Sequence, residues 1–452
     1  MADAARPVQQ PCHVVALPYP GRGHVNAMLS LCRLLAARGV AARVILTEEW
    51  LGLVGAAEPP LPELVRLTAI PDVIPSEHGR AADLPGFADA VNTRMEAPVE
   101  RLLEEMLPTP EMAVVVADFL LQWAVPMALR RGTAACTFCP FSATNFAAVY
   151  HFERLMAGRS LAVDDPMWDQ PIPGHGCLTM RESQPILCGE ASRGRFEARI
   201  RSARTGQCVL FSSFYELEAG VMDALVSEPS SARMYSIGPC IPYTTLEGEP
   251  RGGCSYWAWL DTQPAGSVLY VSLGSFLSLP PSQLGELAMG LVASDVKFLW
   301  ALHDQAQSQV RPLLGGNGNG VLVPWCDQLK VMCHPSVGGF LTHCGINSVL
   351  EAVFAGVPML TLPVAMDQPT NSRLIVDVWK IGYSLKEKMQ PDGIITKEAI
   401  ARAVETLMGS SDLPESNGVR SRALLWKDAS RRAIQEGGSS STDLNSFLSC
   451  MF

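Results

Sequence analysis

Charged residues are scarce in this chain, and basic ones are scarcer than acidic ones. Only 18% of the 452 residues are Asp, Glu, Lys or Arg, and 35 basic against 45 acidic side chains give a formal net charge of −10. A basic surface is the usual electrostatic footprint of a protein that binds nucleic acid or anionic lipid. The composition therefore predicts that neither is a partner.

Long uninterrupted apolar runs are also lacking. The longest apolar stretch, Ala113 to Leu129, is broken by Asp118, Gln122 and Pro126. It falls short of the roughly 20 apolar residues that a membrane-spanning helix needs. The first residues, Met1 to Pro11, are polar and do not resemble a signal peptide. We expect no integral membrane association and a cytoplasmic location.

The cysteines show neither a disulfide framework nor a metal-binding pattern. There are 13, an odd number, scattered between Cys12 and Cys450, which is typical of a protein kept in a reducing compartment. Cys136 and Cys139 form a Cys-x-x-Cys pair, but no second pair or histidine doublet in the sequence completes a zinc site around it. The sequence predicts buried free thiols and no metal.

Length and periodicity predict an α/β protein of two domains. Single hydrophobic cores stop growing at about 250 to 300 residues, and this chain is 48% hydrophobic. Strand-like and helix-like segments alternate, which is typical of doubly wound parallel sheets. The expected strands are Val14–Leu17, Ala42–Leu46, Ala113–Ala117, Ala134–Phe138, Val209–Ser212, Ser267–Leu273, Lys297–Leu302, Val321–Val323, Val337–Leu341 and Met359–Leu362, with helices at Val25–Ala37 and Leu120–Leu129. A stretch rich in Pro and Gly separates the two series, so we expect domains at 1–240 and 255–435, a linker at 241–254 and a final segment at 436–452.

The densest polar chemistry lies between Trp325 and Gln368. Trp325 offers a flat apolar ring, and hydrogen-bonding side chains follow at several separate turns: Gln328, His343, Asn347, Ser348, Glu351, Asp367 and Gln368. Gly345 lies in a turn between a predicted strand and a helix start, where free N–H groups and the helix dipole favour an anion. Asn347 or Ser348 would cap that helix or touch phosphate. This array suits a base, a ribose, a diphosphate and a hexose, so a nucleotide-sugar site is predicted.

One family signature matches this segment at many fixed positions: Trp325, Gln328, His334, Gly338, Phe340, Thr342 to Gly345, Asn347, Ser348, Glu351, Gly356 to Pro358, Pro363, Asp367 and Gln368. Through these residues the chain resembles the plant secondary-product UDP-glycosyltransferases over nearly its whole length. The resemblance implies the GT-B fold, with two Rossmann-like domains whose parallel sheets face a cleft. It also implies a monomer in which the carboxyl-terminal segment packs back toward the first domain.

A tight loop, with Gly21 and Gly23, follows the first strand and places His24 at a helix start. A histidine there is usually a cap or a surface group, but the loop matches the family's Pro-x-Pro…Gly-His pattern, which implies a general base. Asp118 ends a strand of the same sheet and would orient the imidazole, or it would cap the helix that follows. Trp123 also matches the family here and favours the first role.

The family resemblance also implies the remaining roles. The donor is UDP-glucose, a substrate, so no cofactor is expected. Trp325 would stack on uracil, Cys326 and Gln328 would hold base and ribose, Glu351 the ribose hydroxyls, and Asp367 and Gln368 the sugar. The diphosphate would lie near Ser275, His343, Gly345, Asn347 and Ser348. Acceptor contacts are expected from Phe119, Phe141, Ser142 and Thr144, in a pocket built by loops around Leu51, 75–87, 141–152 and 158–186. The reaction would be an inverting transfer to a hydroxyl or carboxyl of a small, partly hydrophobic metabolite, giving a β-glucoside.

Departures from the family pattern leave two alternatives open. Ile346 stands where tryptophan is usual, Asp327 replaces a common proline, and Ala27 replaces the proline after the His24 loop. A catalytically weak UDP-sugar-binding regulatory protein would fit these changes. A nicotinamide-dependent oxidoreductase would use Gly21-x-Gly23 and the acidic pair Glu48 and Glu49, although Asn26 spoils its third glycine and the Trp325–Gln368 segment would be unexplained.

Overall fold

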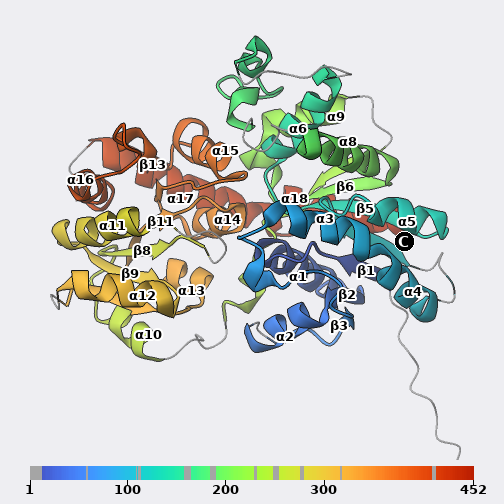
Figure 1. The fold of residues 1–452 in the computed structure, drawn as a ribbon, viewed down its shortest axis with the longest axis horizontal. Helices are drawn as coiled ribbons and strands as arrows, with labels where there is room; N and C mark the ends of the chain where they lie inside the picture. The colour runs from blue at the N-terminus through green and yellow to red at the C-terminus, as the bar shows by residue number, and fades with distance from the viewer. Residues whose placement is uncertain are drawn as a thin grey trace, which may run out of the picture.

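The computed structural model describes residues 13–57, 60–107, 109, 113–156, 164–183, 190–228, 232–247, 254–274, 279–315, 318–409 and 414–452. Met1 to Pro11, Ser275, residues 248–253 of the predicted linker, and residues 158–163 and 184–186 of the predicted acceptor loops lie outside these ranges. Two lobes lie side by side, each built on its own sheet (Figure 1). Within the described ranges, no helix combines the length and apolar character required to cross a membrane.

The first lobe contains a seven-stranded parallel sheet in the order β3-β2-β1-β4-β5-β6-β7. Its strands are β1 Val14–Leu17, β2 Ala42–Thr47, β3 Val65–Ile70, β4 Val114–Asp118, β5 Ala134–Cys139, β6 Cys208–Phe211 and β7 Arg233–Ser236. The central strands are continuous apolar runs because helices cover both faces of the sheet. β1 and β4 are buried along their whole length.

Helices from different parts of the chain form the two cover layers of this sheet. α1 Arg22–Ala36, α2 Glu48–Ala57 and α18 Ser439–Met451 pack on one face, where Val14 and Ala16 point. α3 Leu84–Arg94, α4 Glu96–Met106 and α5 Ala124–Arg130 pack on the other, where Val15 and Leu17 point. α6 Ala143–Met156, α8 Glu190–Thr205 and α9 Ala219–Ser227 pack on the Val209 and Phe211 side chains of β6.

The second lobe has six parallel strands in the order β10-β9-β8-β11-β12-β13. They are β8 Val268–Ser272, β9 Lys297–Ala301, β10 Gly320–Val323, β11 Val337–Thr342, β12 Met359–Thr361 and β13 Gly382–Ser384. α11 Pro281–Ala293, α12 Asp304–Val310 and α16 Lys397–Met408 cover one face. α10 Cys254–Asp261, α13 Gln328–Cys333, α14 Ile346–Ala355 and α17 Pro414–Ile434 cover the other, and α15 Gln368–Arg373 follows β12. The predicted architecture of two parallel-sheet lobes is confirmed.

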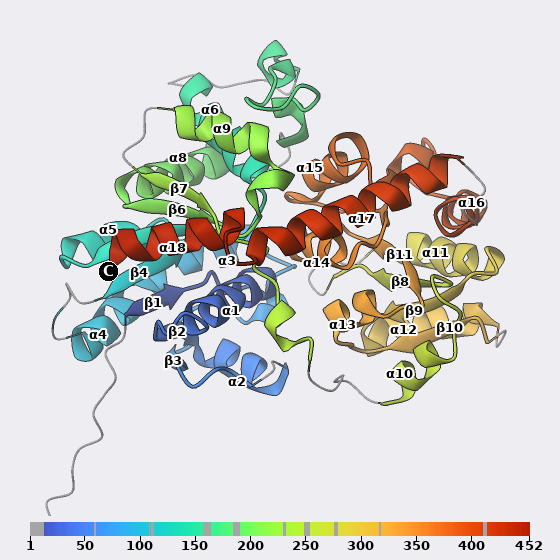
Figure 2. The same cartoon turned by 180° about the vertical axis from the view of Figure 1, so that it is seen from behind.

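The last two helices run across the back of the molecule from the second lobe to the first (Figure 2). α17 packs on α14 of the second lobe, and α18 packs on β7 of the first. Leu444 and Phe447 of α18 are buried in the first lobe's core, and the Asp443 carboxylate accepts a 2.8 Å hydrogen bond from the Ser236 N–H. The chain's end therefore ties the two lobes together.

The predicted helix Leu120–Leu129 begins later than its periodicity suggests. The Leu120 N–H donates to the Asp118 carboxylate and the Leu121 N–H to the Asp118 carbonyl, so a turn precedes α5 at Ala124. The prediction also missed β3, β7 and β13. β3 and β7 are edge strands with exposed side chains such as Arg66 and Arg233, and β13 has three residues, so none forms a long apolar run.

Candidate active site

The carboxyl ends of strands from both sheets open into one cleft of about 760 Å³, whose walls come from both lobes. Doubly wound sheets bind ligands at these ends, where loops lead from strands into helices. The volume is within the usual range of ligand pockets. The first lobe contributes the loops after β1 and β4, and the second those after β8, β11 and β12.

His24 and Asp118 meet across neighbouring strands. β1 pairs with β4 with Leu17 opposite Ala117, which brings the two following loops together. The Nδ1 atom of His24 lies 2.7 Å from Oδ2 of Asp118. The carboxylate is fully buried while 23% of the imidazole is exposed, and His24 lines the cleft. An ionised carboxylate only accepts hydrogen bonds, so Nδ1 carries the proton and Nε2 has the free lone pair.

The two oxygens of Asp118 make different contacts. Its Oδ1 accepts a 2.9 Å bond from the Leu120 N–H, which closes the turn after β4, while Oδ2 holds the imidazole. It does not cap α5, whose N-cap is Trp123. His24 is not a cap either, because the N-cap of α1 is Gly21. The hydrogen bond from the Leu120 N–H to Oδ1 helps to fix the orientation of the carboxylate, so that Oδ2 stays directed at the imidazole.

The opposite wall gathers the predicted base and ribose contacts around Gln328. Its amide donates to the Ser348 hydroxyl at 2.9 Å and to the Glu351 carboxylate at 2.6 Å, and its carbonyl accepts from the Tyr270 hydroxyl at 3.1 Å. Cys326 is buried with its Sγ 3.4 Å from the same hydroxyl. Trp325 lines the cleft with 41% of its surface exposed, unusual for so large an apolar ring. Tyr270 is a residue that sequence analysis did not identify.

The start of α14 faces the cleft between these two walls. Its N-cap is Gly345, and no side chain caps it, so neither Asn347 nor Ser348 acts as the predicted cap. The uncapped N–H groups at the start of α14 stay available to an anion. The Asn347 amide instead donates to the Gly23 carbonyl at 2.6 Å, joining this helix to the loop that carries His24.

Two glycines make room for His343 beside this helix start. A Cβ at Gly345 would lie 2.6 Å from Nε2 of His343, and one at Gly274 would lie 2.7 Å from it. Gly274 also has a φ of +80°, a conformation that a side chain would strain. Burial lowers the pKa of His343 to about 4, with a hydrogen bond to the Ser272 backbone opposing the shift. At neutral pH the imidazole therefore meets a ligand as a neutral group.

The lowered pKa of His343 predicts a loss of stability in mild acid. The unfolded chain takes up this proton below the ordinary value of 6.5, whereas the folded protein does so only near 4. Stability is therefore fully present above pH 6.5 and falls as the pH is lowered toward 4, by about 2 kcal/mol for a ring that also faces the cleft. Urea unfolding at pH 6.5 and 4.5 should show a larger loss for the native protein than for His343→Gln. Equal losses would contradict the assignment.

The predicted sugar contacts follow β12. The Gln368 carbonyl oxygen accepts from the N–H groups of Val364 and Ala365 at 2.8 and 3.1 Å, which leaves its amide hydrogens for a ligand. Asp367 accepts a 2.7 Å bond from Asn371, and burial raises the pKa of the Asp367 carboxyl. Asn371 also accepts from the Asn145 amide of the first lobe at 3.2 Å. Asn145 and Asn371 were not predicted, because their contact joins residues of different domains.

Two of the four predicted acceptor residues line the cleft. Phe119 and Phe141 line the cleft, with ring centroids 5.3 Å apart. Ser142 and Thr144 do not line it, and both are fully buried. The Ser142 hydroxyl accepts from the Asn145 amide at 2.8 Å, and the Thr144 hydroxyl donates to the Glu218 carboxylate at 2.8 Å. Both hydroxyls are at the start of α6: that of Ser142 also accepts from the Asn145 N–H, and that of Thr144 helps to hold Glu218, whose carboxylate accepts from the N–H groups of Ala143 and Thr144.

The first-lobe half of the cleft also has walls that the sequence analysis did not predict. Segment 75–87 contributes Arg80, Leu84 and Pro85, as expected, but Leu51 and the described residues of 158–186 do not line the cleft. The missing wall is α8, through Arg195, Phe196 and Arg199. The spacing of these three residues places them on one helix face, but a polar helix of this kind gives no sequence signal for a pocket.

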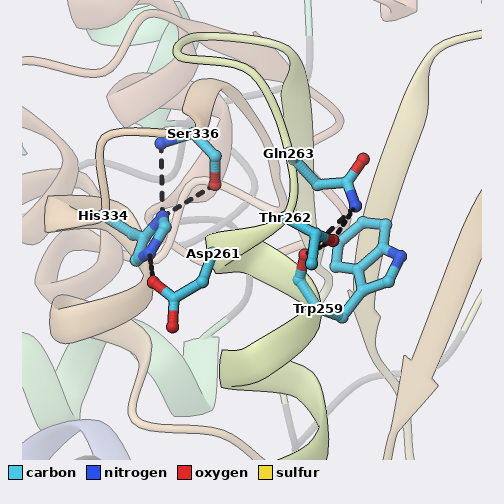
Figure 3. Close-up of polar contacts among 6 residues, drawn as sticks. All are labelled: Trp259, Asp261, Thr262, Gln263, His334 and Ser336. Atoms are coloured by element: carbon cyan, nitrogen blue, oxygen red, sulfur yellow. Dashed lines mark hydrogen bonds and ion pairs between the residues drawn. The ribbon is translucent and has the colours of Figure 1, made fainter.

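His334, part of the family signature, is not among the residues that line the cleft. Figure 3 shows its polar contacts. Its Nδ1 is 2.7 Å from the Ser336 hydroxyl and its Nε2 is 3.1 Å from the Asp261 carboxylate, which imitates a hydrolase triad. Ser336, however, is 1% exposed, and its own N–H also donates to the imidazole at 3.2 Å. At the end of α10 the Trp259 carbonyl accepts from Thr262 at 2.7 Å. The hydrogen bonds of His334 to Asp261 and Ser336 therefore connect the end of α10 to the loop before β11.

The cleft thus has the build of a glycosyltransferase that binds a nucleotide sugar. Residues 244–415 match the model of a family described as UDP-glucoronosyl and UDP-glucosyl transferase. The chain is 37% identical over 98% of its length to UDP-glycosyltransferase 87A2 of Arabidopsis thaliana, of which the alignment covers 97%. It is 31% identical over 96% of its length to the indole-3-acetate beta-glucosyltransferase of Zea mays, covering 97% of that protein.

Solved structures agree with this. Os79 from O. sativa, in complex with U2F and trichothecene, superposes with a TM-score of 0.83 at 28% identity, covering 97% of this chain and 100% of that one. The chain belongs to the plant UDP-glycosyltransferases, enzymes of the hexosyltransferase class with the GT-B fold.

The nicotinamide alternative does not fit the structure or this family. The Glu49 carboxylate, which would bind a ribose, accepts instead from the Ser76 hydroxyl at 2.5 Å and the Glu77 N–H at 2.9 Å. Neither Glu48 nor Glu49 is among the described residues that line the cleft. Of the predicted donor residues that the structure describes, all line it, and only Ser275 is outside the described ranges.

Proposed function

We propose that this enzyme transfers glucose from UDP-glucose to a hydroxyl or carboxyl of a small, partly hydrophobic plant metabolite, with inversion to a β-glucoside. The observation that carries this is the position of the His24–Asp118 pair on one wall of the cleft, opposite Trp325, Gln328 and Glu351 on the other. An acceptor beside His24 would reach the anomeric carbon from the face opposite the diphosphate. That geometry is the one an in-line displacement requires.

In the proposed reaction, Nε2 of His24 takes the proton of the acceptor hydroxyl as its oxygen attacks the anomeric carbon. The bond from that carbon to the diphosphate oxygen breaks with its electron pair, and UDP leaves. Asp118 stabilises the imidazolium that forms, from 2.7 Å. The N–H groups at the start of α14 and the neutral His343 meet the charge on the leaving diphosphate, where preorganised donors act most strongly.

The donor roles follow the geometry of the second lobe. Trp325 supplies a face for uracil, and Glu351, held by Gln328, accepts from the ribose hydroxyls. Asp367 and the unused amide of Gln368 hold hexose hydroxyls. Ile346 is 5% exposed and packs in the core while touching the cleft, so the position that departs from the family pattern is filled by an apolar side chain.

We further propose domains at 1–240 and 255–435, and a monomer that works in the cytoplasm. The first sheet ends at Ser236 and the second begins at Val268, which supports the domain limits. The ten cysteines found free among the described residues support a reducing compartment.

Product analysis tests the proposed reaction. The protein is incubated with UDP-glucose and a mixed library of phenols, acids and terpene alcohols, and products are separated by mass. A gain of one hexose, with a β-configured anomeric proton by NMR, is expected. An α-configured product would contradict the inverting mechanism. UDP-glucose binding with no transfer to any acceptor would favour the regulatory alternative, against which the intact His24–Asp118 pair argues.

A further inference from the structure

Arg199 is a buried cation that forms no ion pair with any described carboxylate, although the Asp118 charge acts on it electrostatically. It lies on α8, is 6% exposed and lines the acceptor half of the cleft. Its Nε has no hydrogen-bond partner, and no carboxylate among the described residues forms an ion pair with it. The guanidinium packs against the Phe196 ring, whose centroid is 5.0 Å from the guanidinium carbon. Burying a cation without an ion-pair partner costs free energy, because the charge loses its hydration. A bound anion would offset that cost.

The side chains around Arg199 add positive charge to this part of the cleft. Arg195 lies one helical turn away on α8 and also lines the cleft. Arg80 lies on the facing wall, but it is already occupied by the Glu77 carboxylate at 3.0 Å and the Pro20 carbonyl at 3.2 Å. The Asp118 carboxylate is hydrogen-bonded to His24 and Leu120, and its charge acts on Arg199 without a direct ion pair. In this half of the cleft, therefore, no described carboxylate forms an ion pair with Arg199.

Arg199 keeps its charge under working conditions. Burial, together with the positive Arg195, lowers the pKa of its guanidinium to about 10, while Tyr19 and the Asp118 carboxylate oppose the shift. Burial also raises the pKa of Tyr19 to about 12, so its hydroxyl stays protonated and neutral. The Tyr19 ring is 5.2 Å from the His24 ring. The cation is thus charged at neutral pH in the part of the cleft that contains the base.

We infer that Arg199, with Arg195 beside it, forms a carboxylate-binding subsite, and that the acceptor is a hydroxy acid whose hydroxyl faces His24 while its carboxylate is held at α8. This rests on the proposed function and narrows it. A guanidinium binds a carboxylate through two parallel hydrogen bonds, which fixes the orientation of a planar acid. A carboxylate held in this way is a poor nucleophile. It also needs no general base, whereas a hydroxyl does, so the His24–Asp118 pair favours transfer to the hydroxyl.

The test compares acceptors that differ only in charge. 4-Hydroxycinnamic acid, 4-hydroxyphenylacetic acid and salicylic acid are each assayed against their methyl esters with UDP-glucose. The native protein should prefer at least one acid to its ester, and alkali should not release the sugar from that product, since it is attached to the phenolic oxygen. Arg199→Met should lower kcat/KM for that acid by about ten- to a hundredfold, the worth of a charge-assisted contact, and leave the ester unchanged.

Controls separate this subsite from a general defect. Arg199→Lys, which keeps the charge, should restore part of the preference, and Arg201→Met, an exposed arginine of the same helix, should behave as the native protein. Arg199→Met should fold, with a Tm no lower than native and an unchanged shift on UDP binding, because the substitution removes an unpaired buried charge.

Four outcomes would overturn the inference. Equal loss on acid and ester in Arg199→Met would make the arginine structural. Native enzyme that transfers to esters or neutral phenols without preferring any acid would reject the subsite while the proposed transferase stands. An alkali-labile acyl glucose from the acid would show that the carboxylate attacks and does not bind at Arg199. Transfer to no member of the panel, with UDP-glucose bound, would overturn both the subsite and the proposed function.

Discussion

His24→Ala is expected to lower the rate of glucosyl transfer by about 10² to 10⁴-fold, the usual contribution of a positioned general base. The buried Asp118 carboxylate holds the His24 imidazole, and part of the ring is exposed at the cleft. Its removal leaves Trp325, Gln328 and Glu351 untouched on the other wall. UDP should therefore still raise the Tm, as in the native protein.

The matched control for this variant is His78→Ala, which removes an exposed histidine that does not line the cleft. It should keep native activity. Initial rates are measured with the best acceptor from the product screen, and UDP binding is followed by thermal shift. A His24→Ala enzyme with activity within a few-fold of native would eliminate the base role. Loss of both transfer and UDP binding would point to a folding defect.

Asp118→Asn should be nearly as damaging as His24→Ala, although it changes one atom and keeps the shape. An asparagine oxygen can still accept from the Leu120 N–H, so the turn after β4 should survive. Its amide would then face Nδ1 of His24 as a donor, and the imidazole would have to accept there and carry its proton on Nε2. With Nε2 protonated, His24 cannot take a proton from the acceptor. A fall in kcat of about 10² to 10⁴-fold is expected, with KM for UDP-glucose unchanged.

The double variant distinguishes a coupled pair from two independent effects. Because Asp118 acts through His24, the variant carrying both His24→Ala and Asp118→Asn should be no slower than His24→Ala alone. Additive losses in kcat would show that Asp118 contributes separately, for example through the turn at Leu120. The protonation state of His24 can be followed directly by NMR of the imidazole nitrogens in the native protein and in Asp118→Asn.

The sequence predicted the second wall of the cleft better than the first. Between Trp325 and Gln368, most of the predicted donor residues lie within one strand–turn–helix unit and its neighbours. Their spacing along the sequence therefore largely determines which way their side chains point. The predicted loop and strand limits held there, with β11 at Val337–Thr342 and α14 beginning at Ile346. The first wall is built from segments far apart in the chain, and Ser142 and Thr144 were misplaced because their partners Asn145 and Glu218 depend on how α6 docks.

The sequence by itself determined the parallel-sheet architecture, and its resemblance to the family supplied the predicted donor-side residues and the choice of His24 and Asp118. Apolar runs of strand length, glycine turns and polar residues at strand ends are local features, and local sterics and burial fix their consequences. Only the tertiary structure decided that β1 and β4 are neighbours, which brings His24 to 2.7 Å from Asp118. It also decided that the Asn347 amide donates to the Gly23 carbonyl, next to His24, and that Arg199 is buried at the cleft with no ion-pair partner among the described residues. Those contacts join residues that are tens to hundreds of positions apart. They depend on how whole helices and strands pack together, which the local sequence pattern does not determine.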